Sequence, residues 1–168
     1  MKTVLIKDVG QHVGNRISLK GWLYNHRSSG KIQFLIVRDG TGFIQGILVK
    51  AESDPQVYDV AAGLSQESAI EVYGTIKSDP RSPGGFEIAL DDVKLISQAE
   101  QYPISLKEHG VDFLLDHRHL WMRTPRQVAV MRIRNTVIKA IRDYLDDLGF
   151  CLIDAPILTP AACEGTTT

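Results

Sequence analysis

Residues 21–45, GWLYNHRSSGKIQFLIVRDGTGFIQ, carry the side-chain types that could bind unpaired nucleobases: arginine, aromatic residues and glutamine. Aromatic rings stack on exposed bases, and arginine and glutamine hydrogen-bond to base edges or phosphates. From Val9 to Arg38 there are five Lys or Arg residues and no Asp or Glu, although the chain has a net charge of −1. A local basic surface with interleaved aromatics suggests a groove for single-stranded nucleic acid.

The same stretch also allows a purely structural interpretation. Trp22, Phe34 and Phe43 could fill a small β-core, with the basic side chains on its solvated face. Composition alone favours this second interpretation, so the positions of these residues in the fold must decide.

Alternating apolar residues and turn signals predict the elements that position this stretch. Strands are expected at 16–24, 32–37, 43–49, 69–76 and 86–96. A short helix is expected from Asp54-Pro55, an N-cap and a first-turn proline, to about Leu64. Asp39-Gly40-Thr41-Gly42 predicts a hairpin, because two glycines can take positive φ.

Three strands, a helix and two strands follow the order of an OB-fold, a five-stranded Greek-key barrel. Its ligand face lies on the second and third strands and the neighbouring loops. The candidate residues fall there, which favours binding over a core role. On the second strand, Phe34 and Ile36 should share one face, with Gln33, Leu35 and Val37 on the other.

The second half of the chain predicts a linker followed by a long helix. We place the all-β OB-fold domain at 1–98, a hinge or linker at 99–124 and an α+β segment at 125–168. The helix should run from Pro125 to about Leu148 and end at Gly149, with a short strand at 150–153. Its apolar residues step by three and four: Val130, Ile133, Val137, Ile141, Leu145 and Leu148.

Other chemistry in this half is weakly signalled. Seven Lys or Arg and no acid lie between Asp116 and Asp143, which suits a solvated face or contact with RNA. His117 and His119 lie two apart, where a helix would not put them on one face, so no metal site is expected. Cys163 has no general base near it in the sequence, so a catalytic thiol is not expected either. Two cysteines without a CxxC, and no signal-peptide or membrane-length apolar run, predict a cytoplasmic protein.

The ordered motifs resemble those of class II aminoacyl-tRNA synthetases of the aspartate, asparagine and lysine subclass. GFCLIDAPIL is similar to the family's motif 1, in which Gly149 and Phe150 end a long helix and Pro156 follows a strand. FLLDHRHLWMR and ILTPAACEGTTT, combined with GWxxxxR and RDGxGxxQ, resemble asparaginyl-tRNA synthetases in particular. An aspartyl enzyme would more usually read ETPxL and then a PEGARD-like loop. The resemblance covers essentially the whole chain.

The resemblance implies a role for particular residues. Phe34 would stack on the central anticodon base, a uridine, while Gln45 would hydrogen-bond to its edge and Arg27 would contact base or phosphate. The loop at 79–85 would read the remaining anticodon bases. Glu164 would bind the ammonium group of the amino acid. Motif 1 and the long helix would form a homodimer interface, and 125–168 would begin the catalytic domain.

The function that the resemblance implies is an asparagine–tRNA ligase. Such an enzyme activates asparagine with ATP and Mg²⁺ and transfers it to tRNA-Asn, whose anticodon is GUU. The family's catalytic motifs 2 and 3 are not in these 168 residues. The chain is therefore expected to bind tRNA, to hold neither ATP nor Mg²⁺, and not to catalyse alone. A non-catalytic OB-fold RNA-binding module with a dimerisation helix, an aspartyl-tRNA synthetase and a general single-strand binder stay open.

Overall fold

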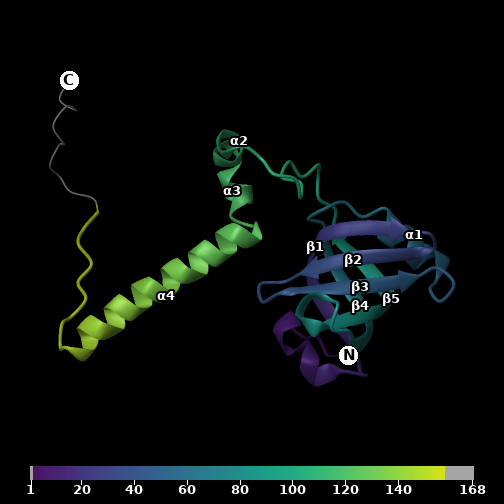
Figure 1. Ribbon diagram of the computed structural model, residues 1–168, viewed down its shortest axis with the longest axis horizontal. Coiled ribbons are helices and arrows are strands. Elements are labelled where there is room, and N and C mark those ends of the chain that lie inside the picture. Colours follow the sequence, from purple (N-terminus) through teal and green to yellow (C-terminus); the bar gives the residue numbers. More distant parts are fainter. Residues whose placement is uncertain (1, 158–168) are drawn as a thin grey trace. The chain divides into compact units, whose positions relative to one another are not determined.

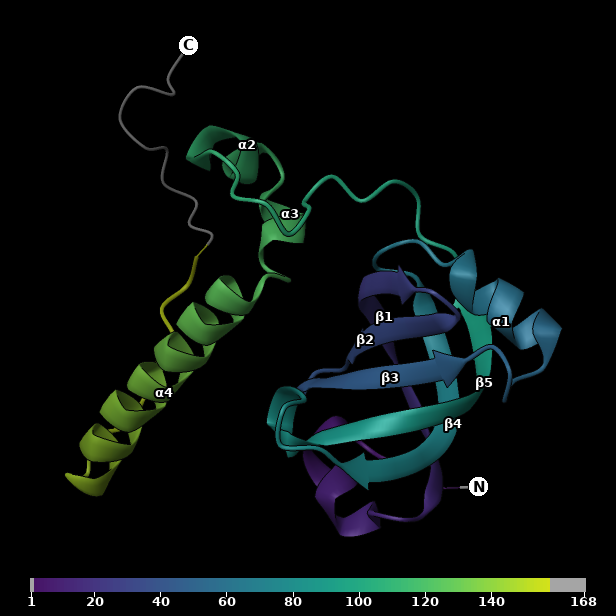
Figure 2. The ribbon, with the colours of Figure 1, turned by 45° about the vertical axis from the view of Figure 1, so that its right-hand side comes forward.

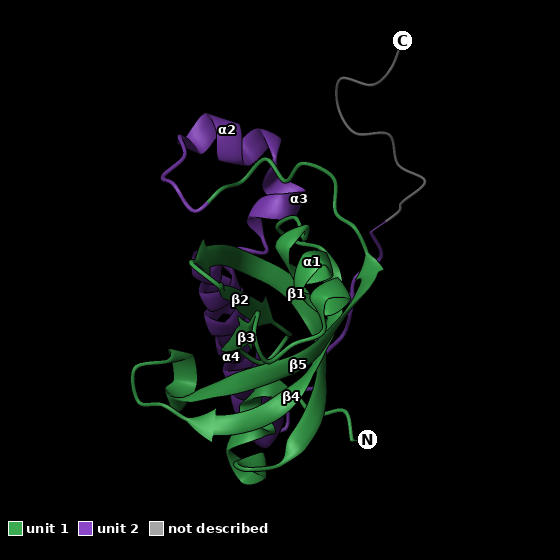
Figure 3. Cartoon of the chain, turned by 90° about the vertical axis from the view of Figure 1, so that its right-hand side faces the viewer, with its two compact units in different colours: residues 1–105 green, residues 106–168 purple. Residues whose placement is uncertain are grey.

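A computed structural model of the chain describes residues 2–157 (Figure 1). Its contacts divide the chain into two compact units, Met1–Ser105 and Leu106–Thr168 (Figure 3). Each unit is described by itself below. Cys163 and Glu164, for which roles were considered above, lie outside the described residues.

The first unit is a closed barrel with the strand order β1-β2-β3-β5-β4 (Figure 2). All neighbouring strands are antiparallel except β3 and β5, which pair in parallel. The predicted OB-fold is therefore confirmed. The strands are β1 (Arg16–Ser29), β2 (Ile32–Arg38), β3 (Phe43–Val49), β4 (Ala69–Ser78) and β5 (Phe86–Ser97).

Three short helices complete the barrel unit. The α-helix α1 (Pro55–Ala62) begins as predicted, with the Asp54 carboxylate accepting a hydrogen bond from the Gln56 N–H at 2.7 Å. The 3₁₀ helix η2 (Pro83–Gly85) lies in the loop between β4 and β5. A further 3₁₀ helix, η1 (Ile6–His12), was not predicted.

The barrel core is aliphatic, and the largest buried side chains are no more than 1% exposed: Leu19, Leu23, Leu35, Ile44, Leu48, Ile70, Ile76 and Ile88. Trp22, Phe34 and Phe43 are not among the buried core residues, and Trp22 is 40% exposed. Successive residues of a strand face opposite sides, so the aliphatic neighbours of these aromatics fill the barrel. The interpretation in which the three aromatics form the core is wrong.

The hairpin between β2 and β3 forms as predicted, but not for the predicted reason. Gly40 and Gly42 are not among the residues with positive φ. Instead, Asp39 Oδ1 accepts hydrogen bonds from the N–H groups of Thr41 at 2.6 Å and Gly42 at 3.0 Å. Asp39 Oδ2 also accepts from the Ile6 N–H at 2.8 Å, so one carboxylate joins the hairpin to η1.

The chain that leaves β5 stays on the barrel unit for several residues. The Ser65 hydroxyl donates to the Ala99 carbonyl at 2.8 Å, and the Ala99 N–H donates to Ser68 Oγ at 3.1 Å. The Gln66 amide donates to the Ile104 carbonyl at 3.3 Å, and Ile104 is 5% exposed. The first part of the segment predicted as a linker is therefore packed against the barrel.

The second unit contains the short helices α2 (Val111–Asp116) and α3 (Arg118–Trp121) and the long helix α4 (Pro125–Asp147). Helix α4 matches its predicted limits closely. It ends as Gly149 takes φ +85°, with the Gly149 N–H donating to Asp146 O at 2.8 Å and the Phe150 N–H to Leu145 O at 3.0 Å.

The strand predicted at 150–153 is not formed in the described part of the chain, where residues 150–156 carry no regular secondary structure. A strand needs a partner for its backbone hydrogen bonds, and residues 2–157 supply none for this segment. Among residues 2–157, every helix is too short or too polar to span a lipid bilayer.

Candidate nucleic-acid interface

The pairing register of the barrel brings the three predicted base-reading residues onto one outer face. Arg27 pairs with Phe34 across β1 and β2, and Phe34 pairs with Ile47 across β2 and β3. The next pair of residues on the same outer face is Ile36 on β2 with Gln45 on β3. Phe34 and Gln45 are therefore diagonal neighbours, a spacing within reach of aromatic and long side chains.

Arg27 and Phe34 are in contact on this face. The guanidinium carbon of Arg27 lies 4.1 Å from the centroid of the Phe34 ring, a cation–π arrangement. Phe34 is half-buried and Arg27 is exposed. The Phe34 ring is thus a flat apolar platform. The side chain that covers it, Arg27, is long and carries hydrogen-bond donors.

The glutamine on this face is Gln45, because the other glutamine of the stretch points inward. Gln33 is only 4% exposed, and its Oε1 lies 2.7 Å from His26 Nε2. The Gln45 amide nitrogen donates to Ser82 Oγ at 3.5 Å. No other hydrogen bond to the Gln45 side chain is present within residues 2–157, so its amide oxygen can accept from a ligand.

Glu87 is a further residue of this face that sequence reasoning did not assign to the site. It pairs with Gln45 across the parallel contact of β3 and β5, and its carboxylate accepts a hydrogen bond from the Ser82 hydroxyl at 3.4 Å. Only the closure of the barrel brings β5 beside β3, so the alternation within β5 could not reveal this neighbour.

The loop between β4 and β5 is held in a defined shape beside the face. Gly84 and Gly85 take φ +72° and +81°, and the Asp79 N–H donates to the Gly85 carbonyl at 3.0 Å. Asp79 also accepts from the Arg81 guanidinium at 3.0 and 3.1 Å and from its backbone N–H at 2.9 Å. The hydrogen bonds from the Arg81 side chain, and to a lesser extent the one from its backbone N–H, hold the pKa of Asp79 below its ordinary range.

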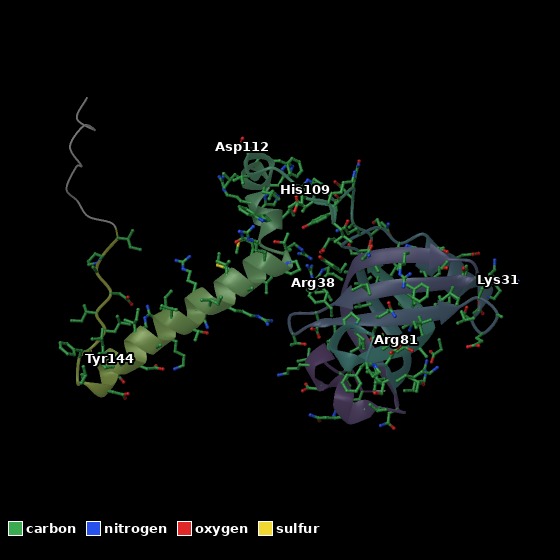
Figure 4. All side chains as sticks on the ribbon, viewed as in Figure 1. Lys31, Arg38, Arg81, His109, Asp112 and Tyr144 are labelled. Carbon is green, nitrogen blue, oxygen red and sulfur yellow. The ribbon has the colours of Figure 1, made fainter. Side chains whose placement is uncertain are left out.

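The acid-free stretch does not form one continuous basic surface. The Arg38 guanidinium is buried in an ion pair with Glu67 at 2.7 Å, and Arg16 donates to both carboxylate oxygens of Asp91. Folding therefore brings carboxylates from distant segments to these cations. Lys31 and Arg38 lie near opposite ends of β2 (Figure 4).

The predicted homodimer interface comprises helix α4 and, after it, Gly149, Phe150 and Pro156, all of which are described. Phe150 is 63% exposed, and Pro156 is exposed as well. Apolar side chains along α4 are 42–65% exposed within the described part of the chain: Val130, Ile133, Val137, Ile141 and Leu145.

Two family models match the chain in succession. The model described as "OB-fold nucleic acid binding domain" matches residues 17–96, and the model described as "tRNA synthetases class II (D, K and N)" matches residues 110–168. Each match falls largely within one of the two compact units.

Similar proteins match the chain over nearly its whole length. It is 57% identical over 168 residues to an asparagine–tRNA ligase of Desulforamulus reducens and 51% identical over 165 residues to one of Thermus thermophilus. A crystal structure of asparaginyl-tRNA synthetase from Pyrococcus horikoshii, complexed with asparaginyl-adenylate, covers 99% of the chain with a TM-score of 0.87 and 33% identity. The chain spans 38–39% of the length of these proteins.

Proposed function

The chain belongs to the asparaginyl-tRNA synthetase family, and on that premise we propose that its barrel reads the anticodon of tRNA-Asn as one part of an asparagine–tRNA ligase. The observation that carries the proposal is the juxtaposition of Arg27, Phe34 and Gln45 on one outer face of the barrel. An aromatic platform beside a polar amide and a cation is the arrangement that recognises an unpaired base.

Stacking takes place on Phe34. A base that approaches the ring displaces the Arg27 guanidinium, and ring–base overlap replaces the cation–π contact. The released guanidinium then has its donors available for a phosphate or a base edge. Arg27 thus covers the apolar ring in the free protein and binds the nucleic acid in the complex.

Base identity is read by Gln45. The Watson–Crick edge of uracil presents one N–H donor between two carbonyl acceptors. The Gln45 amide offers both an acceptor oxygen and N–H donors, so it can pair with that edge. The position of Gln45, diagonal to Phe34 on the paired strand, suits contact with the edge of a base stacked on the ring.

The second unit supplies the link to catalysis and assembly. The exposed apolar residues of α4, with Gly149, Phe150 and Pro156, form a homodimer interface in the whole enzyme. Glu164, outside the described residues, binds the ammonium group of asparagine. The whole enzyme uses ATP and Mg²⁺ in the cytoplasm. The described residues contain no cluster of three or more His, Cys, Asp or Glu side chains that could hold a metal ion.

Binding to RNA stem-loops tests the anticodon proposal. We expect the chain to prefer a stem-loop with a GUU anticodon over one with GCU at about 0.15 M salt. Gln45→Ala should abolish this preference, whereas Gln56→Ala, at an exposed glutamine of α1, should not. Equal binding of both RNAs that fades steeply with salt would contradict the proposal and leave only a phosphate-binding patch.

A further inference from the structure

Gln45, Ser82 and Glu87 form a hydrogen-bonded row on the base-reading face. They come from β3, from the loop before η2 and from β5. The Gln45 amide nitrogen lies 3.5 Å from Ser82 Oγ, which lies 3.4 Å from Glu87 Oε2. Ser82 is 8% exposed, while Gln45 and Glu87 are half-buried. The middle member of the row is therefore the most shielded from water.

The chemistry of the row sets the direction of each hydrogen bond. An ionised carboxylate only accepts, so the Ser82 hydroxyl must donate its single proton to Glu87. A lone pair of Ser82 Oγ is then available to Gln45, and of the two ends of the Gln45 amide only the NH₂ can donate to it. The row thus holds the nitrogen of Gln45 toward Ser82 and leaves the amide oxygen for a ligand.

The orientation of this amide decides which pyrimidine it can select. A glutamine that is free to rotate by half a turn exchanges its oxygen and nitrogen, and then it can pair with either uracil or cytosine. An amide whose oxygen is fixed toward the ligand accepts from the N3–H of uracil. At the same position cytosine presents an N3 lone pair, so two acceptor atoms would face each other without a proton between them.

We propose that Ser82, oriented by Glu87, is a positioning residue that fixes the Gln45 amide and thereby gives the barrel its preference for uracil over cytosine at the central anticodon position. The inference rests on the proposed function. It adds a residue that acts on the central base through Gln45.

The test compares Ser82→Ala with Ser82→Thr. Alanine keeps the backbone bonds of this turn, from the Ser82 N–H to Asp79 O and from the Gly85 N–H to Ser82 O, so the loop should stay folded. We expect Ser82→Ala to reduce the ratio of GUU to GCU affinity about fivefold, which is roughly the effect of one hydrogen bond. Ser82→Thr retains the hydroxyl and should retain the ratio.

Two further variants separate positioning from a general structural effect. In a Gln45→Ala background, Ser82→Ala should cause no further change in the ratio. In the Glu87→Gln variant, the amide at position 87 can donate to Ser82 Oγ as well as accept from it. The Ser82 hydroxyl is then free to donate to the Gln45 oxygen instead, so the ratio should fall.

Three outcomes are decisive against the inference. A wild-type preference that Ser82→Ala leaves unchanged would overturn the inference alone. Any change in the ratio caused by Ser82→Ala in the Gln45→Ala background would show that Ser82 does not act through Gln45. A wild-type chain without any preference for GUU would overturn the proposed function together with the inference.

Discussion

Phe34 lies on the outer side of β2 under the Arg27 guanidinium, with Leu35 buried beside it. Stacking of a base on such a ring contributes about 1–3 kcal/mol. We therefore expect Phe34→Ala to weaken binding of the GUU stem-loop by about that amount, measured by calorimetry. The thermal stability of the barrel should change little, because Phe34 is not among the buried core residues.

Tyr73 provides a matched control for that variant. It is an outward aromatic on β4 whose ring also has cations nearby, with Arg16 at 5.8 Å and Lys94 at 4.8 Å from its centroid. Tyr73→Ala should leave RNA affinity unchanged. If Phe34→Ala instead lost the 3–5 kcal/mol of stability typical of a buried Phe→Ala change, Phe34 would be a core residue and not a platform.

The sequence was sufficient to place Phe34 and Gln45 on one face, because a period of two and a hairpin determine that arrangement. Arg27 lies beyond the predicted end of the first strand, so its role followed only from the family resemblance. The sequence was not sufficient to distinguish Arg27 from Arg38. The carboxylate that neutralises Arg38 comes from Glu67, whose approach depends on pairing between β1 and β4. Glu87 escaped assignment for the same reason, since its neighbour on β3 is brought near only by barrel closure.

The loop between β4 and β5 makes a prediction about pH. Hydrogen bonds from Arg81 lower the pKa of Asp79 in the folded state below the unfolded value of about 3.9. The stabilising contact is therefore fully present above about pH 4, and it is lost as the pH falls through the lowered native pKa. Nuclear magnetic resonance titration should find Asp79 below the ordinary range, and Arg81→Ala should raise its pKa.

A suitable control for this titration is Arg27→Ala, which removes a guanidinium that lies over Phe34 rather than beside Asp79. The pKa of Asp79 should be the same in this variant as in the wild-type chain. An Asp79 pKa that Arg81→Ala does not move would mean that the loop is held by its backbone bonds alone.

Regular alternation explains which elements were predictable. The limits of β2 and β3 agree with the predicted strands to within one residue, because alternation continues without interruption through both. The first strand continues to Ser29 rather than ending near Tyr24, since a register shift between Leu23 and Asn25 breaks its pattern. Helix η1 carries no such period and is held through the Asp39 carboxylate, a long-range contact.

At the scale of the whole molecule, the two units differ in how much apolar surface they cover. The first unit encloses its aliphatic residues, whereas α4 exposes an apolar stripe within the described residues. We expect a chain of residues 1–105 to fold as a monomer and the full chain to self-associate. Light scattering after size-exclusion chromatography measures both masses.

Substitutions on α4 test the cause of that association. Ile133 and Ile141 are 65% and 56% exposed, so the double change to Glu should not disturb a buried core, and it should return the full chain to a monomer. Arg134→Glu, on the same exposed helix, is the control and should not. Equal monomeric masses for residues 1–105 and for the full chain would remove the interface from the proposal.

The parallel contact between β3 and β5 is the shortest strand pairing of the barrel. Only three residue pairs join these strands, Gln45↔Glu87, Gly46↔Ile88 and Ile47↔Ala89, whereas β4 and β5 share ten. Local opening of the closed sheet should therefore begin between these two strands, at the proposed base-reading site. A base that is bound by Gln45 on β3 and also contacts the β4–β5 loop would hold strands β3 and β5 together. Amide protons there would then exchange with solvent more slowly in the complex than in the free chain.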